Sequence, residues 1–135
     1  MDERENQETS IAIILSSNIY NIMHQLTSYE QFEPLIESKS DWILFKHSGR
    51  CSISWGACKQ VETAISSLQL DNVYQLDVFT TWNLKYQIAD FLKIKHESPQ
   101  VIIFSQGEVQ DYANHSSISK WWMSDQLLGR HDTRK

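Results

Sequence analysis

The chain has 135 residues, enough for one compact domain, and 41% of them are hydrophobic, which excludes a largely disordered chain. Its formal net charge of −5 argues against a nucleic-acid surface, and its 2 cysteines are too few for a disulfide scaffold. The acidic start and the short apolar run Ile11–Leu15 fit neither a secretory signal nor a membrane helix. We therefore expect a cytoplasmic protein with no nucleic-acid or membrane partner.

Composition along the chain predicts three parts. Residues 1–25 are interpreted as an N-terminal extension, partly disordered, residues 26–128 as one folded domain, and residues 129–135 as a flexible tail. Within the extension, Ile11–Leu15 and Ile19–Met23 fit either a short helix or two strands, because periodicity does not decide over so few residues.

Helices and strands alternate in the first half of the domain. Thr27 and Glu30 form a capping-box pattern that predicts a helix to about Ser38, and the bulky run Trp42–Phe45 predicts a buried strand. A second helix begins near Cys51 and is expected to end at Asp71-Asn72. Its buried face is marked by residues at three- and four-residue spacing: Ser54, Cys58, Val61, Ile65 and Leu68.

The second half continues the alternation. The predicted elements are a strand over Val73–Val78, a helix carrying Leu84, Ile88, Phe91 and Leu92, a strand over Val101–Phe104, a turn at Gln106-Gly107, a strand over Glu108–Tyr112 and a helix from about Ser117 carrying Ile118, Trp121, Trp122 and Leu127. Two strand–helix–strand units and an antiparallel hairpin predict an α/β fold, with a mixed sheet flanked by helices on both faces.

Cys51 is the first candidate functional residue, because it lies between a buried strand and the helix that follows it. A helix N-terminus stabilises a thiolate, the nucleophile of thiol–disulfide exchange. The alternative is a buried cysteine that acts as a small hydrophobe, but the polar neighbours Ser48 and Ser52 favour exposure. Three residues on, a dithiol oxidoreductase has a second cysteine, whereas this chain has Ser54, which makes the motif C-x-x-S.

Cys58 is predicted to be a core residue and no partner for Cys51. It lies seven residues along the same helix, a rise of ~10 Å. The Cα atoms of a disulfide lie within ~7 Å of each other, so an intact helix excludes a Cys51–Cys58 bridge.

Pro99 precedes a fully apolar strand and is the second informative position. A proline cannot donate to the ladder and therefore belongs at the first residue of a strand or in a special turn. The sequence alone does not indicate a cis bond, because few X–Pro bonds are cis.

Three segments together resemble the monothiol bacilliredoxins, the YtxJ-like family of thioredoxin-fold proteins. They are Phe45-Lys46-His47-Ser48, then Cys51 with Ile53-Ser54, and Lys95-His96-Glu97-Ser98-Pro99-Gln100; Gly107, Ala113, His115 and Ile118 match further on. The resemblance covers about Leu26 to Trp121. The chain departs from the family pattern at Arg50, Ser52, Trp82, Lys85, Asp111 and Asn114, which leaves ligand preference and partner choice open.

The resemblance implies a thioredoxin-like fold and a cytoplasmic thiol–disulfide oxidoreductase of the monothiol type. Cys51 would be the catalytic residue that removes bacillithiol, or a similar low-molecular-weight thiol, from mixed disulfides on client proteins. That thiol is a co-substrate, and no bound cofactor is expected. Ser54 would donate a hydrogen bond to the Cys51 sulfur. The family pattern also implies a cis bond between Ser98 and Pro99, facing Cys51, with the Ser98 backbone pairing with the bound peptide or thiol.

His47 and His96 are supporting candidates, because both precede segments expected near Cys51. A cationic imidazole there would stabilise a thiolate, and the alternative for each is a structural hydrogen-bonding residue. The spacing of the two histidines with Cys51 and Cys58 fits no common zinc site, so no metal is expected.

Two other functions stay open at this point. A thioredoxin-fold binding module with an idle thiol is suggested by the residues around Cys51 that depart from the family. An iron–sulfur carrier of the monothiol glutaredoxin type is less favoured, because no glycine pair lies near Cys51.

Overall fold

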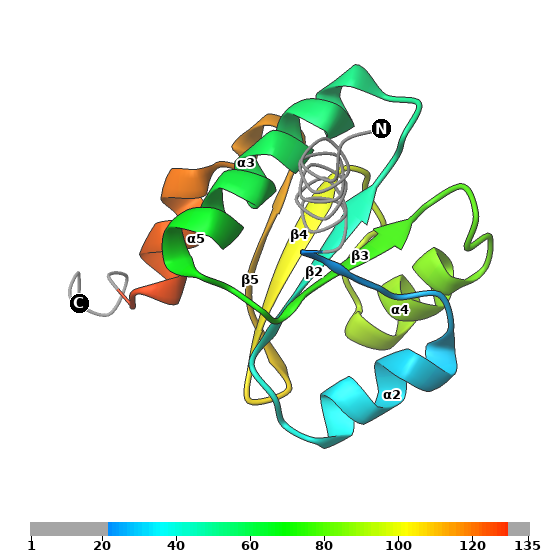
Figure 1. Cartoon of the computed structure of the whole chain (residues 1–135). Helices are drawn as coiled ribbons and strands as arrows, with labels where there is room; N and C mark the ends of the chain where they lie inside the picture. The colour runs from blue at the N-terminus through cyan, green and yellow to red at the C-terminus, as the bar shows by residue number, and fades with distance from the viewer. Residues whose placement is uncertain (1–21, 130–135) are drawn as a thin grey trace, which may run out of the picture.

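The computed structural model describes residues 22–129, which form one sheet flanked by helices (Figure 1). In chain order the elements are β1 His24–Gln25, α2 Tyr29–Glu37, β2 Trp42–His47, α3 Ser52–Leu68, β3 Val73–Asp77, α4 Leu84–Leu92, β4 Gln100–Ser105, β5 Glu108–Asn114, the 3-10 helix η1 His115–Ser117 and α5 Lys120–Leu127. The expectations for residues 1–21 and 130–135 lie outside the described residues. Between residues 22 and 129, each helix is too short or too polar to span a bilayer.

The sheet has the strand order β1-β3-β2-β4-β5 and confirms the predicted α/β fold with a mixed sheet. β1, β3 and β2 run parallel, whereas β4 pairs antiparallel with both β2 and β5. Every residue of the central strand β2 is buried. A strand covered on both faces reads as a continuous apolar run, which is why Trp42–Phe45 could be recognised in the sequence.

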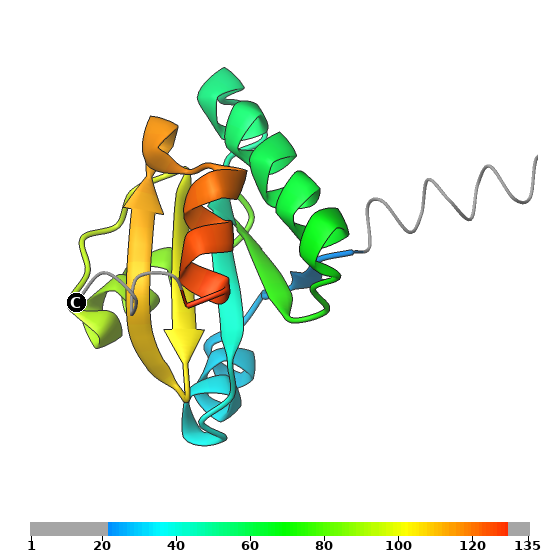
Figure 2. The same cartoon turned by 90° about the vertical axis from the view of Figure 1, so that its left-hand side faces the viewer.

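Alternate side chains of β2 enter two separate cores. Ile43 and Phe45 pack with buried residues of α3 and α5, while Trp42 and Leu44 pack with Phe32 of α2 and with residues of α4. Figures 1 and 2 show the same division, with α3 and α5 on one face of the sheet and α2 and α4 on the other. Successive side chains of a strand point to opposite faces, so this alternation decides which helix each site residue faces.

α3 follows the predicted stripe of small and apolar residues. Its buried side chains are Ser54, Ala57, Cys58, Val61, Ala64 and Ile65. The helix ends at Leu68, before the predicted break at Asp71-Asn72, because Gln69 adopts a left-handed conformation and donates its N–H to the carbonyl of Ile65.

The cap of α2 lies one residue later than the sequence pattern predicts. Ser28 is the N-cap, and the side chain of Gln31, not that of Glu30, accepts the backbone N–H of Thr27 at 2.7 Å. This register leaves Glu30 in solvent and places Phe32 wholly inside the core. The chain therefore offers two overlapping capping patterns, and the one that begins at Ser28 is formed.

The last helix also begins later than predicted. The expected start at Ser117 belongs to η1, and Ile118 is extended and buried against α3 and α5. Ser119 then caps α5, with its hydroxyl accepting the N–H of Trp122 at 3.0 Å. An extended residue is needed to turn Ile118 into the core, so the helix restarts after it.

The sheet begins before the expected domain boundary at residue 26. His24 and Gln25 form β1 and pair with Tyr74 and Gln75 of β3. The strand has 2 residues, which is too short for an alternation pattern to show in the sequence.

The hairpin turn at Gly107 gives a test of this fold. Gly107 has φ +81, and an added Cβ would lie 2.7 Å from the Ile36 carbonyl oxygen. We expect Gly107→Ala to lower the free energy of unfolding by about 2 kcal/mol or more, since a left-handed backbone alone costs ~1–2 kcal/mol. Urea unfolding measures the change. In the control Gly56→Ala, an added Cβ meets nothing within 4 Å, and the free energy of unfolding should rise by about 0.5–1 kcal/mol. Equal stabilities of wild type and Gly107→Ala would contradict the turn geometry.

Candidate active site

The carboxyl ends of β2 and β3 meet at one edge of the sheet, where most of the predicted site residues gather. The two strands run parallel, and the N–H of Val78 donates to the carbonyl of His47 at 3.0 Å. β4 runs the other way and begins at Gln100, opposite Lys46, so Pro99 reaches the same edge. The turn from β2 into α3 and the segment before β4 are therefore neighbours.

Cys51 is the N-cap of α3, as the sequence predicts. Its N–H donates to the carbonyl of Ser48 at 3.2 Å, and its own carbonyl accepts the N–H of Trp55 at 3.2 Å. The thiol is free and the residue is half-buried, which favours the exposed interpretation over that of a core cysteine. The unpaired N–H groups at a helix N-terminus favour negative charge at this position.

Cys58 has the opposite environment. It is buried, and its thiol donates to Oε1 of Glu62 at 3.4 Å. Burial, followed by the charge and the hydrogen bond of Glu62, raises the pKa of Cys58 to about 12. α3 runs without interruption from its N-cap Cys51 past Cys58, so a rise of ~10 Å along the helix axis separates the two residues. Cys58 stays a protonated core thiol at neutral pH.

The Ser54 hydroxyl is not directed as the family resemblance implies. It accepts the N–H of Ser48 at 2.9 Å and lies 2.7 Å from Nδ1 of His47, and Ser54 is fully buried. Within residues 22–129 its hydrogen bonds go to these two partners at the end of β2, and none joins it to the Cys51 sulfur. Ser54 therefore fixes the turn that carries Cys51 and acts on the thiol indirectly.

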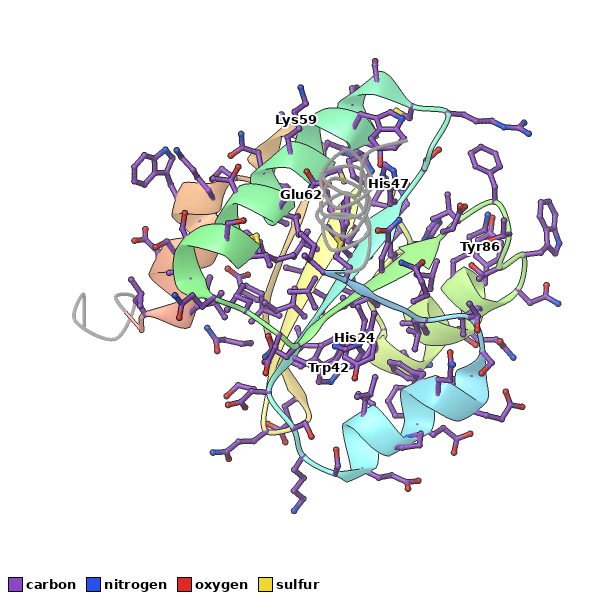
Figure 3. The ribbon with its side chains drawn as sticks, in the orientation of Figure 1. His24, Trp42, His47, Lys59, Glu62 and Tyr86 are labelled. Carbon is purple, nitrogen blue, oxygen red and sulfur yellow. The ribbon has the colours of Figure 1, made fainter. Side chains whose placement is uncertain are left out.

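His47 faces α3 and is only 4% exposed. Figure 3 shows it below the first turns of that helix, and the Trp55 indole packs edge-on against its ring at 4.6 Å. Burial lowers the pKa of His47 and outweighs the opposing carboxylates of Asp77 and Glu62. This shift favours the neutral ring and the structural hydrogen-bonding role over a cationic His47. Its Nε2 atom is buried without a partner among the described residues.

His96 lies on the other face of the sheet. Its Nδ1 atom is 3.4 Å from Nζ of Lys46, and its ring packs edge-on against Tyr86 of α4. Burial, then the charges of Lys46 and Lys85, lowers the pKa of His96 to about 4. Because Lys46 and His47 are neighbours in a strand, their partners lie on opposite faces. The structure thus separates the two histidines that sequence reasoning grouped, and His96 is neutral as well.

The bond between Ser98 and Pro99 is cis, as the family resemblance implies. Pro99 is buried and its carbonyl accepts the N–H of His115 at 2.9 Å. Lys46 contacts His96, which lies three residues before Pro99, and so helps to hold the segment that precedes β4. Burial lowers the pKa of Lys46 to about 8. The Ser98 hydroxyl is buried without a partner among the described residues.

Two residues that hold segments of the site, Gln100 and Trp55, were not predicted from the sequence. Gln100 donates from Nε2 to the carbonyl of Lys95 at 3.1 Å and to Oδ1 of Asn114 at 2.9 Å, tying the Pro99 segment to β5. Trp55 donates from its indole nitrogen to the carbonyl of Gly49 at 2.9 Å. The segment that resembles the family ends in Ser98-Pro99-Gln100, so the resemblance could have indicated a role for Gln100. No sequence pattern indicated a role for Trp55.

Metal chemistry finds no support in residues 22–129, where no group of three or more His, Cys, Asp or Glu side chains is placed to hold an ion. The arrangement offers one accessible thiol at a helix N-terminus and no second thiol within reach. Such a thiol can attack a disulfide and form a mixed disulfide.

The two cysteines should differ sharply in alkylation. With iodoacetamide in mildly alkaline buffer, native protein should be modified at Cys51 and not at Cys58, because Cys58 is buried and its pKa is about 12. Peptide mass spectrometry of native protein, with urea-unfolded protein as the control in which both cysteines react, measures this. Modification of both sites at equal rates in native protein would contradict the structure.

The protein should lose stability on acidification through His96. The unfolded chain takes up the proton near pH 6.5 and the folded chain only near about pH 4, so the unfolded state binds more protons between these values. The free energy of unfolding should therefore fall as pH decreases from 6.5 to 4, and His96→Gln should reduce that slope. Urea unfolding across this range compares the two proteins, and identical slopes would refute the buried neutral His96.

Comparison with known proteins agrees with this site. A family model described as monothiol bacilliredoxin BrxC matches residues 24–122. A solved structure described as a candidate oxidoreductase with a thioredoxin fold is 30% identical, with a TM-score of 0.75 and coverage of 82% of this chain and 97% of that chain. Oxidised mitochondrial thioredoxin 3 from Saccharomyces cerevisiae is 13% identical, with a TM-score of 0.64 and coverage of 82% and 98%.

A thioredoxin from Trypanosoma brucei brucei is similarly distant, at 12% identity, a TM-score of 0.65 and coverage of 82% and 91%. The two thioredoxins show the fold alone. The family match supports thiol–disulfide exchange as the general chemistry. Since that match spans most of the described residues and includes the Cys51 motif, the chain belongs to the monothiol bacilliredoxin family of thioredoxin-fold proteins.

Proposed function

We propose that this protein removes bacillithiol, or a similar low-molecular-weight thiol, from mixed disulfides on client proteins through Cys51. The observation that carries the proposal is the half-exposed thiol of Cys51 at the N-cap of α3, with Cys58 buried and out of reach. A single reactive thiol cannot resolve its own mixed disulfide. It therefore suits a transfer in which a second small thiol completes the reaction.

The proposed reaction has two exchange steps. The Cys51 thiolate attacks the small-thiol sulfur of the client's mixed disulfide, and the disulfide bond to the client cysteine breaks. The client leaves as a thiolate and takes up a proton, while Cys51 now carries the small thiol. The anion of a second small-thiol molecule then attacks the sulfur of the small thiol that Cys51 carries. This step frees the Cys51 thiolate and yields the symmetric disulfide of the small thiol. The second thiol supplies the reducing equivalents.

In this proposal the remaining site residues hold Cys51 and the bound substrate in place. Ser54 and His47 hold the turn that ends at Cys51, through the hydroxyl bonds at 2.9 and 2.7 Å. The backbone of Ser98 pairs with the bound peptide or thiol, and Pro99 and His96 keep its segment in place. These roles are positioning roles, since the sulfur exchange itself needs only Cys51.

Intact-mass spectrometry after parallel incubation with oxidised bacillithiol, glutathione disulfide and coenzyme A disulfide tests the proposal. One small-thiol adduct should form on wild type and on Cys58→Ser, and none on Cys51→Ser. The adduct should disappear when the matching reduced thiol is added.

Two results would overturn the assignment. Adduct formation on Cys58 in Cys51→Ser would move the reactive thiol elsewhere. Wild type that forms no adduct with any of the three disulfides would favour the binding module with an idle thiol.

A further inference from the structure

We propose that a surface beside Cys51 binds an acidic segment of the client protein, an inference that rests on the proposed function. We name it the cationic aromatic surface. Its residues are Arg50, Phe79, Trp82, Lys85 and Tyr86.

The surface lies at the same edge of the sheet as the thiol. β2 and β3 end in parallel, and the bond from Val78 N–H to the His47 carbonyl joins the two connections that follow them. Arg50 immediately precedes Cys51, and its guanidinium lies 4.7 Å from the centroid of the Phe79 ring. This contact bridges the turn that carries the thiol and the connection into α4.

The aromatic side chains of this surface are unusually open. Trp82 is 72% exposed, Tyr86 56% and Phe79 48%. Scattered exposed apolar residues are normal, but here Trp82 and Tyr86 share Lys85 as a cationic partner, and Phe79 contacts Arg50. Aromatic residues and arginine are enriched in protein–protein interfaces, so this composition fits a protein partner.

The two cations point to the charge of that partner. Nζ of Lys85 lies 5.2 Å from the Trp82 ring and 5.3 Å from the Tyr86 ring, and it donates to the carbonyl of Val78 at 2.9 Å. Within residues 22–129, neither Lys85 nor Arg50 forms an ion pair; the ion pairs found there join Lys95 and His115 to Glu97.

Asp77, the acidic residue at the end of β3, is bonded to the backbone of the following connection. The Asp77 carboxylate accepts the N–H of Phe79 at 2.8 Å and that of Thr80 at 3.4 Å. Two cations are thus held on aromatic faces without a carboxylate, on a chain whose net charge is −5. Carboxylates of a partner complement such a surface.

The extent of the surface favours the client over the small thiol as the source of those carboxylates. Arg50, which precedes Cys51, contacts Phe79, while Lys85 of α4 lies over the rings of Trp82 and Tyr86. A peptide that continues from the thiolated cysteine can meet both cations in succession. The carboxylate of a small thiol bound to Cys51 is the other outcome of the test.

The test uses two peptides with the same central cysteine, in a mixed disulfide with uncharged 2-mercaptoethanol. One peptide carries aspartates and glutamates on both sides of the cysteine, and the other carries asparagines and glutamines at those positions. At low salt, kcat/KM should be about fivefold higher for the acidic peptide, as expected for two exposed charge pairs. The preference should shrink as salt is added.

Charge reversal separates recognition from a merely structural effect. Arg50→Glu and Lys85→Glu should each remove the preference for the acidic peptide, and the double variant should favour a third peptide with lysines at those positions. Lys59→Glu, an exposed position on α3 away from Tyr86 (Figure 3), is the matched control and should keep the wild-type preference.

The outcomes distinguish this inference from the function on which it rests. Equal kcat/KM for the acidic and neutral peptides refutes the acidic client, while Cys51-dependent exchange continues. A preference that follows an anionic small thiol, such as glutathione in place of 2-mercaptoethanol, whatever the peptide charge, also refutes it. Exchange with none of the peptides refutes the proposed function itself.

Discussion

One buried hydroxyl connects the turn that carries Cys51 to the sheet. Ser54, in the first turn of α3, bonds to the His47 ring at the end of β2 and to the N–H of Ser48 in the following turn. A buried backbone N–H without an acceptor costs about 1–3 kcal/mol, so this hydroxyl opposes other conformations of the turn. That turn ends at Cys51. The direction of the thiol therefore depends on the Ser54 hydroxyl, although this hydroxyl bonds to His47 and Ser48 and not to the sulfur.

The alternation of side chains along β2 decides the electrostatics around the thiol. His47 faces α3 and hydrogen-bonds to Ser54 of that helix. Lys46, one residue earlier, faces α4 and contacts His96. Burial lowers the pKa of both histidines, so neither brings a positive charge to the site. The positive field near Cys51 comes instead from the N-terminus of α3 and from the exposed guanidinium of Arg50.

The sequence predicted those features that repeat or that depend on one element. The buried strand over Trp42–Phe45, the stripe on α3 and the contrast between Cys51 and Cys58 follow from spacing alone. Features that depend on contacts between elements were not predicted from the sequence. The cap of α2 at Ser28 and the extended Ile118 before α5 were not predicted, and Lys46, the partner of His96, lies 50 residues earlier in the chain. Periodicity carries no information on such pairs.

The two cysteines impose an order on the proposed reaction. Cys58 is protonated and lies ~10 Å along α3, so it cannot release a thiol held by Cys51. Under the proposed function, the mixed disulfide at Cys51 persists until a second thiol arrives from solution. The client must leave before that thiol can attack, because a client still bound beside Cys51 would cover the small-thiol sulfur that the second thiol attacks. A surface that binds the client weakly, through exposed charges, permits this departure, since exposed ion pairs contribute only about 0.2–1 kcal/mol each. Weak recognition beside Cys51 is therefore compatible with turnover, whereas a tightly closed pocket would retain the client and block the second step.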